Sequence, residues 1–188
     1  MGGQLRGTAT ASYARHRFAL VRSWLDAATV AEHAAASLEL SFRRVSVGDS
    51  RGTWEEHLLG GDSGLRRLLT GAAAWALVGE ALTGDTPGRP GPGRARCWLN
   101  RYGTGEWIPP HKDAAGTAHL VVCLLAPPPE SGGTLRLLAP TGPSNVHLAA
   151  GDALLFEATT VEHMTTPLVP TAGTPLPVRT VAVARYFL

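Results

Sequence analysis

The sequence has 188 residues, of which 44% are hydrophobic and 17% charged, and its formal net charge is +2. This length and balance are typical of one compact domain, so we expect a single domain over residues 1–188. The mild basic charge does not require a nucleic-acid partner, and no apolar run approaches the roughly 18 residues of a membrane span.

The first half of the chain predicts strands and helices in alternation. Residues 1–12 are small and polar, and we expect them to be disordered. We predict a strand for FALVRSWL, an N-cap at Asp26 and a helix for AATVAEHAAASL. A second strand is predicted for LELSFRRVSVGD, and one helix for SGLRRLLTGAAAWALVGEAL, whose apolar residues share one face. A surface loop is predicted for TGDTPGRPGPGR.

Residues 94–188 predict an all-β region. Short β-rich segments, punctuated by Gly and Pro, occur at RCWLNRYG, AHLVVCLLAP, GTLRLLAP, NVHLAAGDALLFEA and VRTVAVARYFL. Such segments are typical of an antiparallel sandwich or barrel. We therefore predict a mainly β fold in which the N-terminal helices pack on one sheet.

The two cysteines, Cys97 and Cys123, lie in predicted strands. They show no CxxC spacing, and no secretory signal precedes them. This pattern favours reduced thiols, so we expect a cytoplasmic protein.

The segment IPPHKDAAG places His111 and Asp113 two residues apart. In a strand, both side chains would project from one face and could reach a single ion. An HxD pair is common by chance, but His163, at the expected end of a later strand, offers a third ligand. Two histidines and one carboxylate that leave three positions open form the facial triad of non-haem Fe(II) oxygenases.

Arg179 opens the predicted final strand and would point inward among apolar neighbours. A buried arginine is costly unless it meets an anion. The distal carboxylate of 2-oxoglutarate would suit it, because a guanidinium is always charged and pairs bidentately with a carboxylate.

Four segments in family-like order resemble the Fe(II)/2-oxoglutarate-dependent dioxygenases, with features of prolyl-hydroxylase-like and AlkB-like members. They are NRYGTGEWIPPHKD, SGGTLRLL, AGDALLFEATTVEHMTTPL and RTVAVARYF, within residues 94–188. The resemblance implies a double-stranded β-helix, that is, a distorted jelly roll, with supporting helices from the N-terminal half. It also implies that the protein uses Fe(II), 2-oxoglutarate and O2.

Residue by residue, the resemblance implies that His111, Asp113 and His163 bind iron. Arg179 is expected to clamp the C5 carboxylate of 2-oxoglutarate. Tyr102 is expected to donate a hydrogen bond to the same carboxylate.

Two further co-substrate contacts are implied less directly. Asn100 matches an asparagine that binds the co-substrate in AlkB-type demethylases. Because the loop before the last strand is long and proline-rich, Arg185 is an alternative to Arg179 as the residue that binds the C5 carboxylate. Since these arginines are six residues apart and share a strand face, Arg185 would otherwise face the C1 carboxylate.

Three more residues have two interpretations each. Alternation places His119 and Cys123 on one strand face, where they either approach the co-substrate or substrate, or are strand-end or core residues. Leu135 either packs against the co-substrate chain or belongs to the core.

These features predict an enzyme that hydroxylates an unactivated C–H bond of a small molecule, free or tethered to a carrier protein, in specialised metabolism. Asp113 favours hydroxylation, because halogenating relatives replace that carboxylate with a small residue. One alternative is an AlkB-type demethylase of nucleic acid, although the sequence lacks the expected basic surface and nucleotide lid. The other is a metal-binding jelly roll without catalysis, against which the arginine clamp argues.

Overall fold

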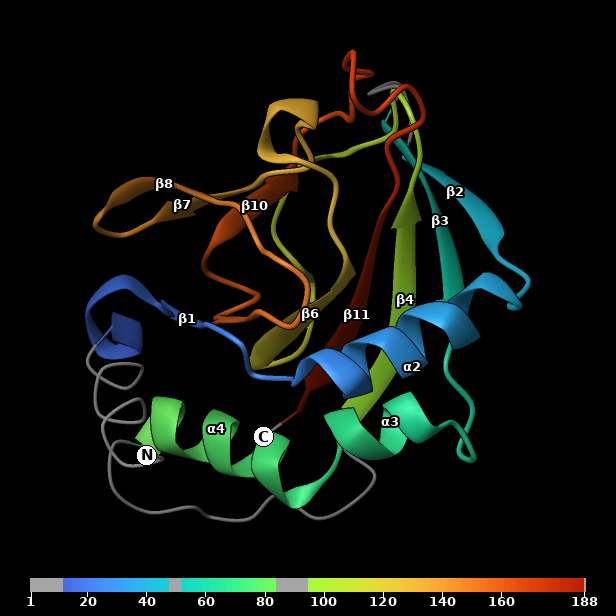
Figure 1. The fold of residues 1–188 in the computed structure, drawn as a ribbon. Coiled ribbons are helices and arrows are strands. Elements are labelled where there is room, and N and C mark those ends of the chain that lie inside the picture. Colours follow the sequence, from blue (N-terminus) through green and yellow to red (C-terminus); the bar gives the residue numbers. More distant parts are fainter. Residues whose placement is uncertain (1–11, 48–51, 84–94, 188) are drawn as a thin grey trace.

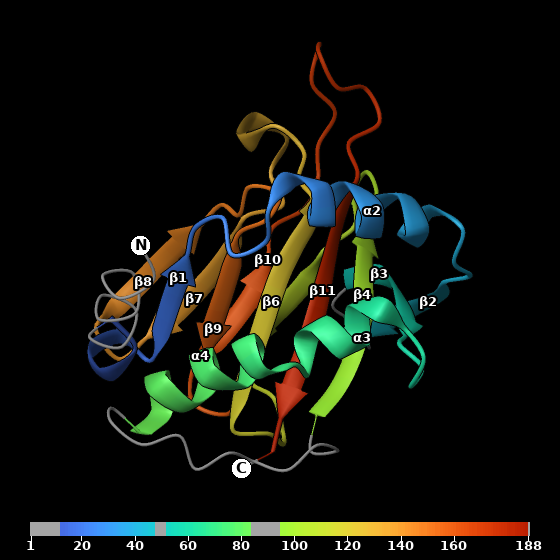
Figure 2. The same cartoon turned by 60° about the horizontal axis from the view of Figure 1, so that its bottom comes forward.

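Two antiparallel sheets face each other in the computed structural model, which describes residues 12–47, 52–83 and 95–187. Helices lie against the outer face of the larger sheet (Figures 1 and 2). Within the described residues, the larger sheet has seven strands in the order β1-β9-β6-β11-β4-β3-β2, and the smaller has four in the order β5-β10-β7-β8. The predicted fold class, a mainly β jelly roll with helices packed on one sheet, is confirmed.

The strands and helices have the following bounds. The larger sheet contains β1 (Phe18–Val21), β2 (Arg43–Val47), β3 (Gly52–Leu58), β4 (Ala95–Tyr102), β6 (Ala118–Leu125), β9 (Ala153–Phe156) and β11 (Arg179–Tyr186). The smaller sheet contains β5 (Ile108–His111), β7 (Leu135–Ala139), β8 (Gly142–Val146) and β10 (Glu162–Thr165). The helices are α2 (Ala27–Leu38), α3 (Gly64–Leu69), α4 (Ala72–Thr83) and the 3-10 turn η2 (Pro129–Ser131).

The central strands β6 and β11 are buried on both faces. Side chains on one face, such as Leu120 and Ala182, belong to the core that the helices cover. Side chains on the other face, such as Val121 and Val183, belong to the core between the sheets. This two-sided burial explains why the segments are apolar almost without interruption.

Several element boundaries agree with the predictions. Asp26 caps α2, since its Oδ1 accepts a hydrogen bond from the Thr29 amide at 2.8 Å. The predicted strands at 118–127, 133–140 and 178–188 contain β6, β7 and β11, and the one at 96–103 matches β4 to within one residue at each end. The predicted loop at 83–94 lies outside the described residues, except for Thr83 at the end of α4.

Other boundaries differ from the predictions. The helix expected at 63–82 is broken into α3 and α4 at Gly71, where a Cβ would lie 3.0 Å from the Arg67 carbonyl oxygen. The segment NVHLAAGDALLFEA forms two strands, because the Asp152 carboxylate accepts from the Ala149 amide at 2.9 Å and closes a turn between them. Strand β1 ends at Val21, and the predicted strand at 38–49 is β2, shortened to Arg43–Val47.

The N-terminal segment is ordered earlier than expected. Residues 1–11 of the predicted disordered stretch lie outside the described residues, but a short helix spans 12–16. It holds Tyr13, whose ring is buried in the core beneath the helices. Among the described helices, none has the length and apolarity to cross a membrane.

The double-sided core predicts a large loss of stability for Leu120→Ala. Leu120 is fully buried between the larger sheet and the helices, so truncation should leave a cavity and lower the free energy of unfolding by about 3 kcal/mol. Leu138→Ala is the matched control, because Leu138 is 53% exposed on β7. Urea denaturation measures both changes, and equal losses would contradict this description of the core.

Candidate functional site

Strand pairing brings the two predicted histidine ligands together. His111 ends β5 and lies opposite His163 of β10 in the antiparallel ladder, with ring centroids 4.2 Å apart. Asp113 follows β5 and is held there because its amide donates to the Ala158 carbonyl oxygen at 3.1 Å. One ligand atom from each of the three residues lies within 4.8 Å of the others.

The local geometry differs from the prediction in two respects. Asp113 lies beyond the strand, so the loop rather than strand alternation turns its carboxylate toward the histidines. His163 is the second residue of a four-residue strand rather than the residue after one. The three residues nevertheless meet as the sequence predicted.

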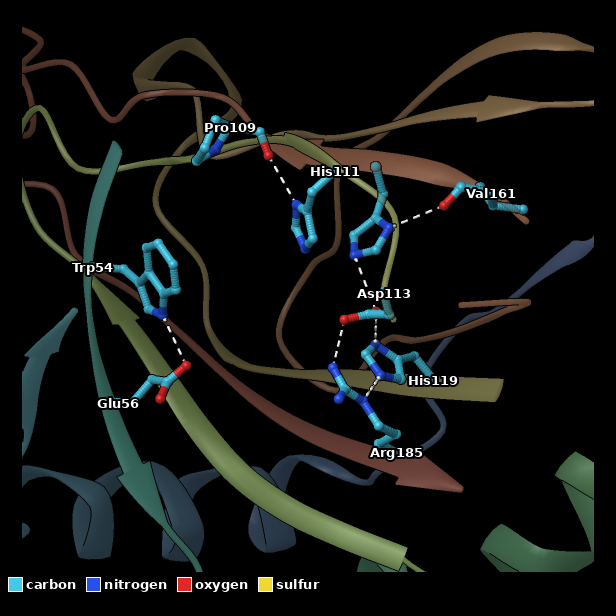
Figure 3. Close-up of polar contacts among 9 residues, drawn as sticks. Trp54, Glu56, Pro109, His111, Asp113, His119, Val161 and Arg185 are labelled. Carbon is cyan, nitrogen blue, oxygen red and sulfur yellow. Dashed lines mark hydrogen bonds and ion pairs between the residues drawn. The ribbon is translucent and has the colours of Figure 1, made fainter. Parts of the chain in front are cut away.

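Backbone carbonyl groups fix the tautomers of both histidines (Figure 3). Nδ1 of His111 lies 2.8 Å from the Pro109 carbonyl oxygen, and Nδ1 of His163 lies 3.1 Å from that of Val161. A carbonyl can only accept, so each Nδ1 carries the proton and each Nε2 keeps a free lone pair. Burial lowers the pKa of His163 to about 4, and the nearby His111 adds to this effect. The rings are therefore set up to bind a metal through Nε2.

The Asp113 carboxylate lies against two neighbours, the partly buried Arg185 and the buried His119. Arg185 donates through Nη2 to Oδ1 of Asp113 and through Nε to Nε2 of His119, the latter at 2.7 Å. His119 must therefore accept at Nε2 and carry its proton on Nδ1, which lies 3.2 Å from Oδ2 of Asp113. Burial keeps the pKa of His119 well below its ordinary value, so its ring stays neutral. Oδ2 has no hydrogen-bond partner among the described residues and lies 3.7 Å from Nε2 of His163.

Arg179 is a buried cation without an anion. It is 2% exposed, and neither Nη1 nor Nη2 has a hydrogen-bond partner among the described residues. Its guanidinium carbon lies 5.5 Å from the ring centroid of Tyr102, its partner across the β4–β11 ladder. Burial raises the pKa of the Tyr102 hydroxyl, while the nearby Arg179 guanidinium, Thr165 and Asn100 act in the opposite direction. Gly133 packs close by, since a Cβ there would lie 3.0 Å from Cδ of Arg179.

One cavity of about 250 Å³ joins the three ligands to Arg179. Asn100, Tyr102, Leu135 and Arg185 also line it, whereas Cys123 is buried in the core between the sheets and does not. The two arginines of β11 face different parts of this cavity. Arg179 faces Tyr102, and Arg185 faces Asp113. The donor set suits a divalent metal, and the orphaned guanidinium suits a carboxylate.

Strand β3, which was not predicted from the sequence, contributes Trp54 and Glu56 to the cavity wall. The indole Nε1–H of Trp54 donates to Oε1 of Glu56 at 3.2 Å (Figure 3). The available signal was the alternation in GTWEEHL, which places Trp54 and Glu56 on one face. Thr165 on β10 is a further lining residue that was not predicted.

No protein-family model matches the sequence, and no curated protein matches it. Solved structures match it over nearly its whole length. The prolyl-4-hydroxylase of Pseudomonas putida has a TM-score of 0.77 at 18% identity, covering 98% of this chain and 100% of that chain.

Two further solved structures are similar as well. The α-ketoglutarate-dependent epimerase SnoN from nogalamycin biosynthesis has a TM-score of 0.69 at 23% identity, covering 97% of this chain and 85% of that chain. HygX from Streptomyces hygroscopicus, solved with nickel and 2-oxoglutarate bound, has a TM-score of 0.72 at 14% identity, covering 95% and 85%. The resemblance found in the sequence is thus confirmed in three dimensions: this chain has the fold of the 2-oxoglutarate–Fe(II) oxygenases.

Proposed function

We propose that the protein is an Fe(II)- and 2-oxoglutarate-dependent oxygenase that hydroxylates an unactivated C–H bond. One observation carries the proposal: a single cavity holds a preorganised His-Asp-His ligand set and a buried arginine whose terminal nitrogens lack a partner. A metal ligand set alone would also fit a storage or structural site. The orphaned cation beside it calls for an organic anion in the same cavity.

His111 and His163 would hold iron through Nε2, and Asp113 through its carboxylate. Bound iron supplies the activation of O2, so that 2-oxoglutarate, O2 and R–H become succinate, CO2 and R–OH. The protein's part is to fix the ligands: the Pro109 and Val161 carbonyl groups hold the rings. Such outer contacts set ligand orientation and basicity.

Arg179 would bind the C5 carboxylate of 2-oxoglutarate through both terminal nitrogens. Tyr102 lies under the guanidinium and would add a hydroxyl donor. Apolar side chains between the two ends of the cavity, among them Leu135, Val181 and Val183, exclude water. Water exclusion strengthens the charge pair and protects reactive species from side reactions.

A small-molecule substrate, free or carried by a partner protein, fits a cavity of this volume. The structural neighbours include a hydroxylase and an epimerase, so the fold supports more than one type of reaction. Hydroxylation in specialised metabolism in the cytoplasm remains the outcome and setting that we propose. Retention of the Asp113 carboxylate supports it over halogenation.

The test is an anaerobic titration of the protein with Fe(II) and 2-oxoglutarate. Chelation of iron by the keto acid should give a weak visible charge-transfer band, and oxygen should then release succinate. A protein that binds iron but shows no such band would be a metal-binding jelly roll rather than an oxygenase.

Alanine at any one of His111, Asp113 or His163 should abolish this band and succinate release, because three protein ligands are needed for the facial geometry. Absorption spectroscopy and a succinate assay measure the two effects. His33→Ala on α2 is the control and should behave as the wild type. Wild-type behaviour of any of the three variants would remove that residue from the ligand set.

Arg179→Ala should raise the KM for 2-oxoglutarate about a hundredfold, equivalent to roughly 2.7 kcal/mol, because the carboxylate loses its charge partner. Arg179→Lys should recover only part of this loss, since an ammonium cannot pair bidentately. The KM is measured from succinate release. A larger effect of Arg185→Ala than of Arg179→Ala would reassign the clamp.

Arg185→Ala should instead weaken iron binding by about tenfold to a hundredfold, because Asp113 loses the donor that orients Oδ1. Competition with a chromophoric chelator gives the iron affinity, and Arg185→Lys should retain part of it. His119→Gln keeps an oxygen that can accept from Arg185 and should be milder than Arg185→Ala. Unchanged iron affinity in Arg185→Ala would show that the ion pair serves stability alone.

A further inference from the structure

We propose that the substrate carries a protonated amine and that Glu56 binds it on the cavity wall across from the iron ligands. The inference rests on the proposed function, because it names the class of substrate that the same cavity accepts. Figure 3 shows Trp54 and Glu56 on one side of the site and the side chains of His111 and Asp113 on the other. His163 lies opposite His111 in the β5–β10 ladder. All five residues line the same cavity.

Strand β3 presents Glu56 to the cavity. Trp54 and Glu56 are two residues apart and share the inner face of β3, whereas Glu55 faces the other way. Glu56 lies opposite Asn100 of β4 in the antiparallel ladder. The carboxylate therefore belongs to a regular sheet, which holds it more precisely than a loop would.

The Glu56 carboxylate is held in place but keeps free acceptor capacity. Its Oε1 accepts from the indole of Trp54, which is itself buried. Its Oε2 lies 3.5 Å from Nη2 of Arg43, whose side chain is 79% exposed. A carboxylate offers about four acceptor positions, and an exposed ion pair of this kind contributes little. A ligand can thus reach Glu56 without breaking a strong contact.

The other charged side chains that line the cavity have partners in the proposed scheme, so Glu56 is available to bind the substrate. Arg179 is matched by the co-substrate carboxylate, and Arg185 pairs with Asp113, the proposed iron ligand. Among the described residues that line the cavity, Glu56 is the one charged side chain with no part in this scheme. An anionic substrate would meet it without compensation, whereas a cation would be attracted.

A second acceptor lies on the same wall. Asn100 is 6% exposed, and its Oδ1 has no hydrogen-bond partner among the described residues. A buried acceptor without a donor is unfavourable until a ligand supplies one. An ammonium has donors and no acceptors, so it satisfies both Oδ1 of Asn100 and the Glu56 carboxylate.

The Glu56 carboxylate, rather than an aromatic ring, determines the preference of this cavity for a cationic ligand. Trp98 also lines the cavity, but the guanidinium of Arg185 already lies 5.4 Å from its ring centroid. A second cation on that ring would be repelled by the first. Charge pairing with Glu56 is therefore the interaction to test.

The experiment uses Zn(II)-loaded, 2-oxoglutarate-bound full-length protein, which cannot turn over, and three probes of similar shape. 2-Phenylethylamine is cationic, 2-phenylethanol is neutral and 3-phenylpropanoate is anionic. Dissociation constants come from ligand-observed NMR titrations. The amine should bind about tenfold more tightly than the alcohol, and the acid more weakly than either.

Glu56→Gln preserves shape and one acceptor oxygen but removes the charge, so it should abolish the preference for the amine. Glu55→Gln is the matched control: Glu55 neighbours Glu56 on β3 and pairs with Arg101 at 2.7 Å on the opposite face, so the preference should persist. Equal binding of amine and alcohol by the wild type, or an undiminished preference in Glu56→Gln, overturns the inference. The wild-type comparison stands even if a variant does not fold.

The same preparations separate this inference from the proposed function. Wild type and Glu56→Gln should both give the Fe(II)–2-oxoglutarate band, because Glu56 touches neither ligand set. The band without an amine preference would refute only the substrate class. An amine preference without the band would refute the oxygenase proposal and leave a cation-binding cavity.

Discussion

The burial of the Arg179 guanidinium is the constraint around which the site is arranged. An unpaired buried charge costs several kcal/mol, and the neighbouring ring of Tyr102 offsets only part of that cost. The strand that carries Arg179 is the centre of the larger sheet, flanked by β6 and β4, and the side chain is 2% exposed. Its terminal nitrogens, which have no hydrogen-bond partner among the described residues, border the same cavity as the three candidate metal ligands.

The same strand links the two ends of the cavity. Arg179 begins β11 and faces Tyr102, while Arg185 near its end faces Asp113 on the smaller sheet's side. Because side chains alternate along a strand, a shift of one residue in the register of β11 would turn both arginines out of the cavity together. The end of the cavity with Arg179 and the end with Arg185 and Asp113 are thus fixed relative to one another by one strand.

Several strands and the three candidate metal ligands could be predicted from the sequence, because the patterns that indicate them are local. Alternation and Gly/Pro punctuation located β4, β6 and β11, and spacing identified His111, Asp113 and His163. Contacts across the fold could not be predicted: Arg185 and Asp113 lie 72 residues apart, and only the pairing of the sheets places them together. Strand β3 was missed because Trp54 and Glu56 alternate onto one face but Glu56 is charged, so the segment lacks the apolar face by which strands are usually located.

The position of β3 within the larger sheet keeps one wall of the cavity apart from the two histidines of the candidate metal site. The wall with Trp54 and Glu56 lies next to the outermost strand, β2, whereas His111 and His163 belong to the smaller sheet. Substitutions on the β2–β3 ribbon can therefore alter the shape and charge of that wall while leaving the metal ligands and the central strand untouched. The shape and charge of one cavity wall can thus change independently of the two candidate histidine ligands, because the wall and these ligands belong to different sheets.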